Sequence, residues 1–449
     1  MTFKISDELV EQVRILIEED NKSEVLELLS TYHYADVAEI LEEINFEMAV
    51  YVIKLLDSDK TSDILSELDE DIREKILENL SAREIAKEVT ELDTDDAVDI
   101  ISELPEDRQK KVIDKIKDED LKADIQELLT YDENSAGGLM AKELVKVNEN
   151  WTVTECVREM RSQAANVTRV HSIYVVDNEG RLIGRLSLKD LLIAPDREKI
   201  SNVYIPRVDS VHVSEDAEDV ARLMQKYDLE AIPVIDDDKI LQGRITIDDI
   251  VDVIKEEAEK DYQLAAGITH DVEADDGILE LTRARLPWLF LGLMGGIGAA
   301  LIMGDFEAML QNHAVLFFFT PLIAAMAGNV GVQSSAIIVQ GLANDDVKGS
   351  INNRLFKEML LAALNGLILA MFLLLFVWFW EKNVYTALAI SISLIVVIIV
   401  AGIIGTFVPL FLDKRGIDPA IATGPFITTS NDIFGILIYF WIAKLVLQI

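Results

Sequence analysis

The sequence predicts a multi-domain membrane protein with an acidic α-solenoid, an α/β tandem repeat, a connecting helix and a transmembrane bundle of five helices. Three observations predict this order: charged and apolar residues are segregated, residues 139–254 contain an internal repeat, and five long apolar stretches follow Arg285. The 449 residues are too many for one ordinary domain. We place the boundaries of the four parts at 1–130, 131–250, 251–285 and 286–449.

The charge distribution separates the chain into two halves. The formal net charge is −39, yet from Pro287 onwards there are only nine of the 80 acidic residues and seven of the 41 Lys and Arg residues. So negative a protein repels nucleic acid and anionic lipid surfaces, so no nucleic-acid partner is expected. Three interpretations stay open: solubility or a halophilic habit, a surface that collects cations, and carboxylate clusters that pack only with divalent ions.

Several function classes lack their sequence signals. Cys156 is the only cysteine, which excludes an intrachain disulfide and a CxxC metal site, and the five histidines are too scattered to indicate zinc. No nucleophile–base pair or phosphate loop indicates an enzyme. The N-terminus has no apolar signal-peptide core, so we expect the acidic half to stay in the cytosol.

The apolar half contains stretches at roughly 287–304, 314–343, 359–380, 385–412 and 419–447. Each is long enough to cross a hydrocarbon layer of about 30 Å. Lys and Arg alternate between the connecting loops, which predicts a multi-pass protein of the cell membrane with its N-terminus in the cytoplasm and its C-terminus outside. Gly292 and Gly296 form a GxxxG pair, a signal of close helix packing in a lipid bilayer.

A carboxylate lies deep in the last apolar stretch, where Asp432 occurs within ITTSNDIFGILIYFW. A charge at that depth is costly and normally faces a water-filled path. We therefore expect Asp432 to be a cation ligand. The alternative is an ion pair with Lys444, about three turns away on the same helix.

The second stretch carries neutral polar residues in PLIAAMAGNVGVQSSA. We expect Pro321 and the glycines to break this helix and expose carbonyl groups to a pore; interhelical hydrogen bonding is the alternative. A set of carboxylate, amide and carbonyl oxygens suits Mg²⁺, Ca²⁺ or Mn²⁺, and Mg²⁺ keeps several waters, so one or two carboxylates suffice. A homodimer would supply two. The predicted pore residues are Asp432, Asn329, Gly328, Asn431 and Gln333.

The repeat aligns two copies at a constant offset: Asp177, Gly184 and Asp190 correspond to Asp236, Gly243 and Asp249, 59 residues later. Each copy indicates a strand, a helix, a β-hairpin and a second helix. The repeat resembles a pair of CBS domains, which implies a regulatory module, often dimeric, that in many cases binds adenine nucleotides. The candidate ATP-binding residues are the matching pairs Ser187 with Asp190 and Thr246 with Asp249. Helix N-capping is the alternative role.

Short acidic helices are expected before the repeat, where DVAEILEEI (36–44), SDILSEL (62–68), IAKEVTEL (85–92) and DAVDIISEL (96–104) share helical spacing. Their stacking as a solenoid is the natural interpretation. After the repeat, residues 247–266 predict one long acidic helix. Without cations, the carboxylates of this helix repel other acidic surfaces, whereas bound Mg²⁺ draws the helix to those surfaces. A helix with two such positions can act as a gate. The alternative is an acidic helix that is merely solvated.

The order of parts resembles the MgtE family of magnesium channels from end to end. The motifs that carry the resemblance are SAGGLM (135–140), PLIAAMAGNVGVQSSA (321–336), GIIGTFVPL (402–410) and DPAIATGPFITTSNDIFG (418–435). The resemblance implies a homodimer with the pore at the dimer interface and a hydrated Mg²⁺ at the intramembrane aspartate, matched here by Asp432. It also implies that cytosolic Mg²⁺ binds acidic surfaces and closes the pore, with the connecting helix as plug.

The predicted regulatory Mg²⁺ ligands come from three places. They are Asp95 or Asp96 facing Asp248; Glu215, Asp216, Glu218 and Asp219 in the second CBS copy; and Asp249, Asp252, Glu256 and Glu259 on the connecting helix. Two other functions stay open, a nucleotide-gated transporter for another substrate and a membrane-anchored sensor without transport. Channel against carrier, and selectivity among Mg²⁺, Mn²⁺, Co²⁺ and Ca²⁺, also stay open.

Overall fold

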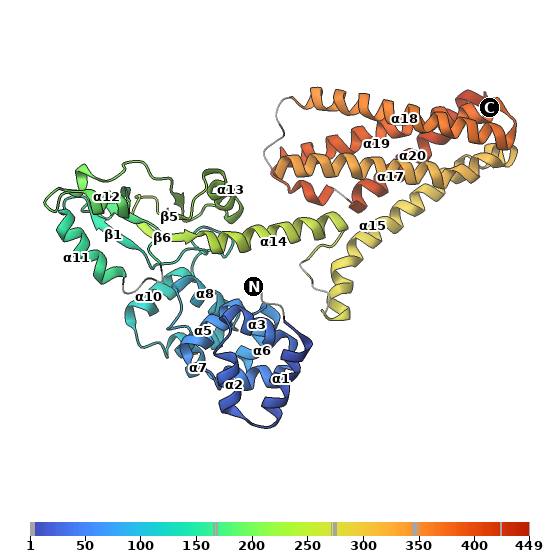
Figure 1. Ribbon diagram of the computed structural model, residues 1–449. Helices are drawn as coiled ribbons and strands as arrows, with labels where there is room; N and C mark the ends of the chain where they lie inside the picture. The colour runs from blue at the N-terminus through green and yellow to red at the C-terminus, as the bar shows by residue number, and fades with distance from the viewer. Residues whose placement is uncertain are drawn as a thin grey trace. The chain divides into compact units, whose positions relative to one another are not determined.

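The computed structural model describes residues 5–164, 167, 169–270, 272, 276–343, 347, 350–422 and 424–448. The chain divides into two compact units, residues 1–255 and 256–449, and each is described by itself. Figure 1 follows the chain from the blue helices of the first unit to the red helices of the second.

The N-terminal part of the first unit is a stack of short helices. In its described residues they are α1 (Asp7–Glu18), α2 (Lys22–Leu29), α3 (Tyr34–Glu43), α4 (Phe46–Ile53), α5 (Ser58–Glu67), α6 (Glu70–Glu78), α7 (Ala82–Glu88), α8 (Thr94–Ser102), α9 (Glu106–Ile113) and α10 (Glu119–Leu128). Polar caps start several of them, such as Ser81, whose hydroxyl accepts from the Glu84 amide while the Glu84 carboxylate accepts from Ser81 N.

Alternate helices of this stack pack on each other, α3 on α5, α5 on α7 and α7 on α9. Each of α3, α5, α7 and α8 contributes a fully buried isoleucine to one continuous core: Ile40, Ile64, Ile85 and Ile100. The predicted helical solenoid is therefore confirmed.

The α/β part follows. Its elements are β1 (Val145–Asn148), α11 (Val153–Gln163), β2 (Ile173–Val176), β3 (Leu182–Leu186), α12 (Leu188–Ile193), η2 (Ile200–Asn202), β4 (Val211–His212), α13 (Ala217–Tyr227), β5 (Ala231–Ile235) and β6 (Leu241–Thr246). They form two sheets, β1-β2-β3 and β4-β5-β6, each with one parallel and one antiparallel pairing.

The two sheets repeat each other in register. Gly184 pairs with Val175 in the first sheet, and Gly243 pairs with Val234 in the second, at the offset of 59 that the sequence shows. The hairpin turns also match, because Asp177 Oδ1 accepts from the Glu179 and Arg181 amides, and Asp236 Oδ1 does the same two and four residues on. The predicted duplication is confirmed.

The connecting helix α14 (Ile247–Ala266) is continuous over 20 residues, as predicted. It starts in the first unit and ends in the second. Its first turn carries Asp248 and Asp249.

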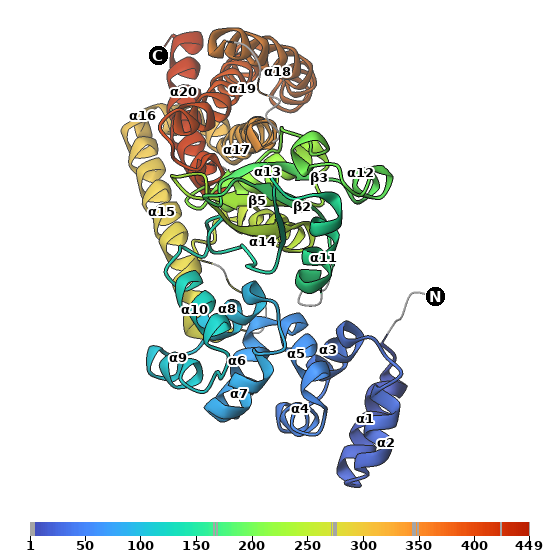
Figure 2. The same ribbon diagram turned by 90° about the vertical axis from the view of Figure 1, so that its left-hand side faces the viewer.

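The second unit contains α15 (Ile278–Asp305), α16 (Glu307–Asn312), α17 (Ala314–Ala343), α18 (Ile351–Glu381), α19 (Val384–Asp413), η3 (Pro419–Ala422) and α20 (Gly424–Leu447). Within the described residues, five of these helices are long and apolar enough to cross a membrane, which agrees with the five predicted spans. Helix α19 packs against α17, α18 and α20, and α15 packs against α20. Figures 1 and 2 both show α17 to α20 gathered in one bundle.

One local expectation is wrong. Helix α17 runs without interruption from Ala314 to Ala343, through Pro321 and the glycines that were expected to break it. A proline removes only one backbone N–H donor from the helix. Inside a membrane bundle, groups on neighbouring helices can satisfy the backbone carbonyl that loses this donor. The glycines serve packing instead, since a Cβ on Gly405 would lie only 2.4 Å from Gly331 O.

Candidate functional site

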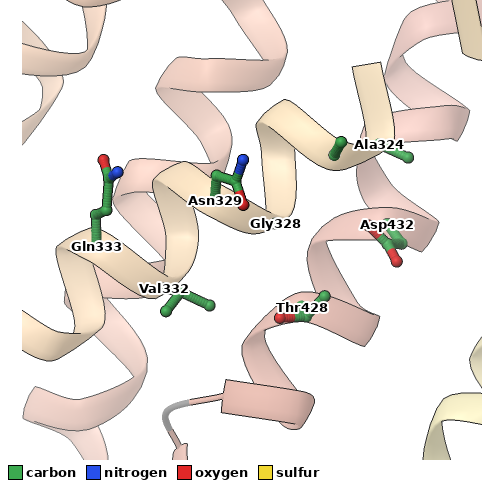
Figure 3. Close-up of a pocket in the computed structure, with 8 residues that line it drawn as sticks. Ala324, Gly328, Asn329, Val332, Gln333, Thr428 and Asp432 are labelled. Atoms are coloured by element: carbon green, nitrogen blue, oxygen red, sulfur yellow. The ribbon is translucent and has the colours of Figure 1, made fainter. Parts of the chain in front are cut away.

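A cavity of about 440 Å³ lies between α17 and α20 in the second unit. Figure 3 shows its lining, which consists of Ala324, Ala325, Gly328, Asn329, Val332, Gln333, Thr428 and Asp432. The six α17 residues recur at helical spacing and so share one face of that helix. Among the polar lining groups there are one carboxylate, two side-chain amides and one hydroxyl.

Asp432 faces α17 across a glycine. A Cβ on Gly328 would lie 3.8 Å from Asp432 Oδ1 and 3.3 Å from Thr428 Cγ2, so the bare backbone at this position leaves room beside the carboxylate. Within the part of the chain that the structure describes, no basic side chain forms a salt bridge with Asp432. The carboxylate therefore faces the cavity without a protein counter-ion from the described residues of its own chain.

Asn431 does not line this cavity. Its side chain is 1% exposed and packs against α17, where a Cβ on Gly331 would lie 1.8 Å from Asn431 Nδ2. Both Nδ2 and Oδ1 lack hydrogen-bond partners among the described residues. The structure thus brings four of the five predicted pore residues together at the cavity: Asp432, Asn329, Gly328 and Gln333. Asn431 is instead buried in the contact between α20 and α17.

A second group of carboxylates lies in the first unit, where α8 meets the start of α14. Burial, followed by the Asp249 and Asp96 carboxylates, raises the pKa of Asp95 well above its usual value. Burial and then Asp249 raise the pKa of Asp96 to about 7. Burial also raises the pKa of Asp249 to about 6, against the opposing effect of hydrogen bonds from Thr246.

The group extends along α8 to Asp99. Burial, followed by the charge of the Asp96 carboxylate, raises the pKa of Asp99 to about 7. Asp95, Asp96 and Asp249 are half-buried, and carboxyls this close repel each other when they are ionised, so the group favours protons or bound cations. Arg244, 5% exposed, lies at the edge of the group, with Nη2 3.5 Å from Asp93 Oδ2. Among the described residues, no three such side chains already converge on a single metal position.

The comparisons with known proteins match the whole order of parts. The MgtE family model, described as divalent cation transporter, matches residues 320–442; the MgtE intracellular N domain matches residues 32–134; and the CBS domain matches residues 136–197 and 200–256. The magnesium transporter MgtE of Enterococcus faecalis is 37% identical over 71% of both chains, and that of Bacillus subtilis is 35% identical over 70% of both. This chain belongs to the MgtE family.

Solved structures of soluble domains agree with this assignment over about half of the chain. The cytosolic domain of the Mg²⁺ channel MgtE, in complex with ATP, is 33% identical, with a TM-score of 0.51, over 54% of this chain and 99% of that chain. The soluble part of a magnesium transporter is 30% identical, with a TM-score of 0.50, over 56% and 99% of the two chains. The MgtE family is a transporter family and not an enzyme class.

Asp248, in the first turn of α14, lies beside the α8–α14 group, where its charge adds to the effects that raise the pKa values of Asp96 and Asp249. The remaining predicted regulatory residues of this MgtE-family chain lie apart from that group or outside its unit. Asp216 caps α13, and Glu218 and Asp219 both pair with Arg222, at 2.6 and 3.2 Å. Asp252 is exposed on α14, while Glu256 and Glu259 belong to the second unit. The Glu215 carbonyl accepts from the Ala136 amide, so the contact of this residue with the linker is made by its backbone.

The two candidate nucleotide motifs differ in their surroundings. Thr246 donates to Asp249 Oδ2 from its hydroxyl at 2.8 Å and from its amide at 3.0 Å, so this pair caps α14 inside the acidic group. Ser187 Oγ accepts from the Lys189 amide at 3.2 Å and caps α12, next to a half-buried Asp190. A separate cavity of about 400 Å³ in the CBS pair is lined by residues 206–210 with Leu182, Ile183, Ile235 and Lys239, and by neither motif.

Sequence reasoning missed several members of both sites. Thr428 lines the cavity one turn before Asp432, and its position four residues earlier on the same helix was a usable signal. Asp99 belongs to the acidic group for the same reason, three and four residues after Asp96 and Asp95. The position of Arg244 beside the acidic group had no signal in the sequence, because the sequence of a strand does not show which helix its side chains contact.

Proposed function

We propose that this chain transports Mg²⁺ across the cell membrane and that Asp432 binds the passing ion. The observation that supports this most is the composition of the α17–α20 cavity, in which the polar side chains are one carboxylate, two amides and one hydroxyl. Oxygen ligands without thiolate or imidazole suit hard divalent cations. The relatives' name, magnesium transporter, favours Mg²⁺ among these.

The size of the cavity is compatible with a hydrated ion. Six waters occupy about 180 Å³ at their share of liquid volume, and the cavity measures about 440 Å³. Mg²⁺ loses its waters reluctantly and is commonly held by one or two carboxylates through them. Asp432 is thus proposed to hold the ion partly through water, with Asn329 and Gln333 as further partners of the hydration shell.

A homodimer completes this site. One chain supplies a single carboxylate to a dication, and a second copy that meets it at the α17–α20 face supplies the second. The proposed orientation has the N-terminus in the cytoplasm and the C-terminus outside, on the basis of the Lys and Arg distribution. Light scattering of the purified chain in detergent measures the mass, and a monomer that still transports Mg²⁺ contradicts this part.

The direct test of the pore residue is Mg²⁺ uptake into proteoliposomes. Asp432→Asn keeps the shape of the side chain and removes its charge, so uptake is expected to fall by at least tenfold while the protein stays folded. Asp305→Asn, at the exposed end of α15, is the matched control. Unchanged uptake by the Asp432→Asn protein rules out the assigned ligand, and no uptake by any form supports a sensor without transport.

We further propose that cytosolic Mg²⁺ closes the path. Asp95, Asp96 and Asp249 are the proposed ligands in the first unit, and residues 251–285 act as the plug between the CBS pair, 131–250, and the pore part, 286–449. The raised pKa values of Asp96 and Asp249 support this, because burial and then neighbouring carboxylates disfavour the ionised form, and a bound dication offsets both effects. Glu215, Asp216, Glu218, Asp219, Asp248, Asp252, Glu256 and Glu259 remain secondary candidates.

The Mg²⁺ concentration on the side of the membrane that holds the first unit, called the sensor side, is the variable that tests this regulation. Raising it is expected to slow uptake, and Asp249→Asn is expected to shift the half-closing concentration upwards severalfold, because one ligand is lost. Asp107→Asn, exposed on α9, is the control. Uptake that ignores sensor-side Mg²⁺ contradicts the regulation but leaves the pore proposal intact.

We also propose that ATP binds the CBS pair, since a related cytosolic domain is named as a complex with ATP. Ser187 and Asp190 are favoured, because Thr246 and Asp249 already engage each other. Calorimetric titration with ATP tests this, with Asp190→Ala expected to weaken binding at least tenfold and Asp196→Ala expected to leave it unchanged. Equal binding by both variants excludes Asp190. ATP that changes uptake at fixed Mg²⁺ favours nucleotide gating.

A further inference from the structure

A second carboxylate lies inside the membrane-spanning bundle, away from the cavity. Glu358 is on α18, and its Oε1 accepts a hydrogen bond of 2.6 Å from Ser334 Oγ on α17. Ser334 is 4% exposed. A carboxylate in a membrane-spanning helix is costly, and such residues face the bundle interior and serve transport as a rule.

The carboxylate is wedged between three helices. A Cβ on Gly402 of α19 would lie 3.1 Å from Glu358 Oε1 and 3.6 Å from its Cγ. The bare backbone of α19 therefore accommodates the side chain on one side, and Ser334 of α17 holds it on the other. Glu358 does not belong to the cavity lining, so it is not itself a ligand of the proposed pore ion.

The hydrogen bond between Ser334 and Glu358 affects the cavity because it restrains α17, the helix that carries six of the lining residues. Ser334 directly follows Gln333, which lines the cavity, and neighbouring residues on a helix differ by about 100° in direction. Ser334 also lies six residues beyond Gly328, about 9 Å along the axis of α17. A contact that fixes the rotation of α17 at Ser334 thereby fixes where Gln333 and Asn329 point.

We propose that Glu358 is a positioning residue for transport, whose hydrogen bond from Ser334 holds the cavity face of α17 towards the ion. The proposal rests on the transport function proposed above. It assigns the effect to the acceptor oxygen of Glu358 and not to its charge. A role in folding alone would change the amount of intact protein, whereas a positioning role changes how the intact protein handles the ion.

The test uses the full chain in proteoliposomes and measures the Mg²⁺ concentration that gives half-maximal uptake, with uptake scaled to the amount of folded protein. Glu358→Ala and Ser334→Ala are each expected to raise this concentration about tenfold, near the upper end for the loss of one ordinary hydrogen bond. The double variant is expected to equal the worse single variant, because both changes remove the same contact. Lys357→Ala, exposed on the same helix, is the control.

Two conservative variants complete the test. Glu358→Gln keeps an acceptor oxygen and Ser334→Thr keeps the hydroxyl, so both are expected to transport as the unchanged chain does, even where the alanine variants fail to fold. A folded Glu358→Gln protein with the defect of Glu358→Ala overturns the proposal, since the charge is then what matters. Additive effects in the double variant overturn it as well. Asp432→Asn in the same assay reports separately on the pore proposal.

Discussion

Gly331 of α17 and Asn431 of α20 touch so closely that a Cβ on the glycine would lie 1.8 Å from Asn431 Nδ2. The same glycine meets Gly405 of α19 with its carbonyl group. Two residues without side chains, Gly331 and Gly405, thus let α17 approach α20 and α19 closely. This close approach sets the distance between the cavity face of α17 and Asp432.

Gly331→Ala is therefore expected to disrupt the bundle. The added methyl group overlaps Asn431, and overpacking of this kind costs about 1–3 kcal/mol or more, which exceeds the roughly 1 kcal/mol that alanine gains over glycine in a helix. Thermal unfolding in detergent is expected to show a lower midpoint, with reduced Mg²⁺ uptake. Gly304→Ala, whose Cβ meets nothing within 4 Å, is the control, and equal midpoints for the two variants contradict the packing account.

The stability of the α8 region is expected to depend on pH when divalent ions are removed. Asp96 has a pKa of about 7 in the folded chain against an ordinary 3.8, so its protonated form contributes stability that is complete below about pH 4 and is lost as the pH rises through about 7. Asp99, also at about 7, acts in the same direction.

Amide exchange of α8, corrected for its intrinsic pH dependence, measures this effect in chelator. Protection is expected to fall between about pH 4 and pH 7, and Asp96→Asn is expected to flatten the fall because it removes the titrating group. Added Mg²⁺ is expected to restore protection at pH 8. If amide protection of α8 instead rises with pH in the presence of chelator, ionisation of these carboxyls does not destabilise the helix and the prediction is wrong.

Thr94 ties the helical stack to the CBS pair. Its hydroxyl donates to Glu143 Oε2 at 2.8 Å, its amide donates to the same oxygen at 3.1 Å, and its hydroxyl accepts from the Lys142 amide at 2.8 Å. Thr94→Val keeps the shape and the amide bond to Glu143, but it leaves the half-buried Lys142 amide without its acceptor and removes the hydroxyl bond to Glu143, at a cost of about 1–3 kcal/mol. Faster proteolysis within residues 131–143 is expected. The exposed Thr130→Val is the control, and equal cleavage rates refute the tie.

A buried ion pair, Arg73 with Glu103, is expected to stabilise the stack only as a pair. The side chains are 14% and 8% exposed, and Arg73 Nη1 also donates to three carbonyls, those of Leu65, Ser66 and Leu68. Arg73→Met leaves the carboxylate buried and alone, which costs about 3–5 kcal/mol.

Chemical denaturation of the full chain measures this loss as a fall in the first unfolding transition. The double variant Arg73→Met with Glu103→Leu is expected to recover most of the loss, since no charge is then left buried. A double variant as unstable as Arg73→Met alone would show that the donors to the three carbonyls, and not the ion pair, account for the effect.

Much of the architecture was predictable because each feature leaves a local trace. The apolar stretches are long runs, the CBS duplication repeats at 59 residues, and the solenoid helices carry their own caps and apolar spacing. Asp432 was predictable for the opposite reason, since a lone carboxylate in an apolar helix is conspicuous.

The faces of the membrane helices were decided by tertiary structure alone. Helices that are apolar all round have no amphipathic period, so nothing in the sequence separates Gln333, which lines the cavity, from Ser334, which contacts Glu358, or from Asn431, which is buried behind Asp432. The same limit applies to the acidic half, where carboxylates are too many for pattern to select Asp95, Asp96, Asp99 and Asp249. The sequence by itself determined which segments are helices, strands and spans, because those depend on neighbours along the chain; the partners of each side chain depend on neighbours in space, and only the fold decided them.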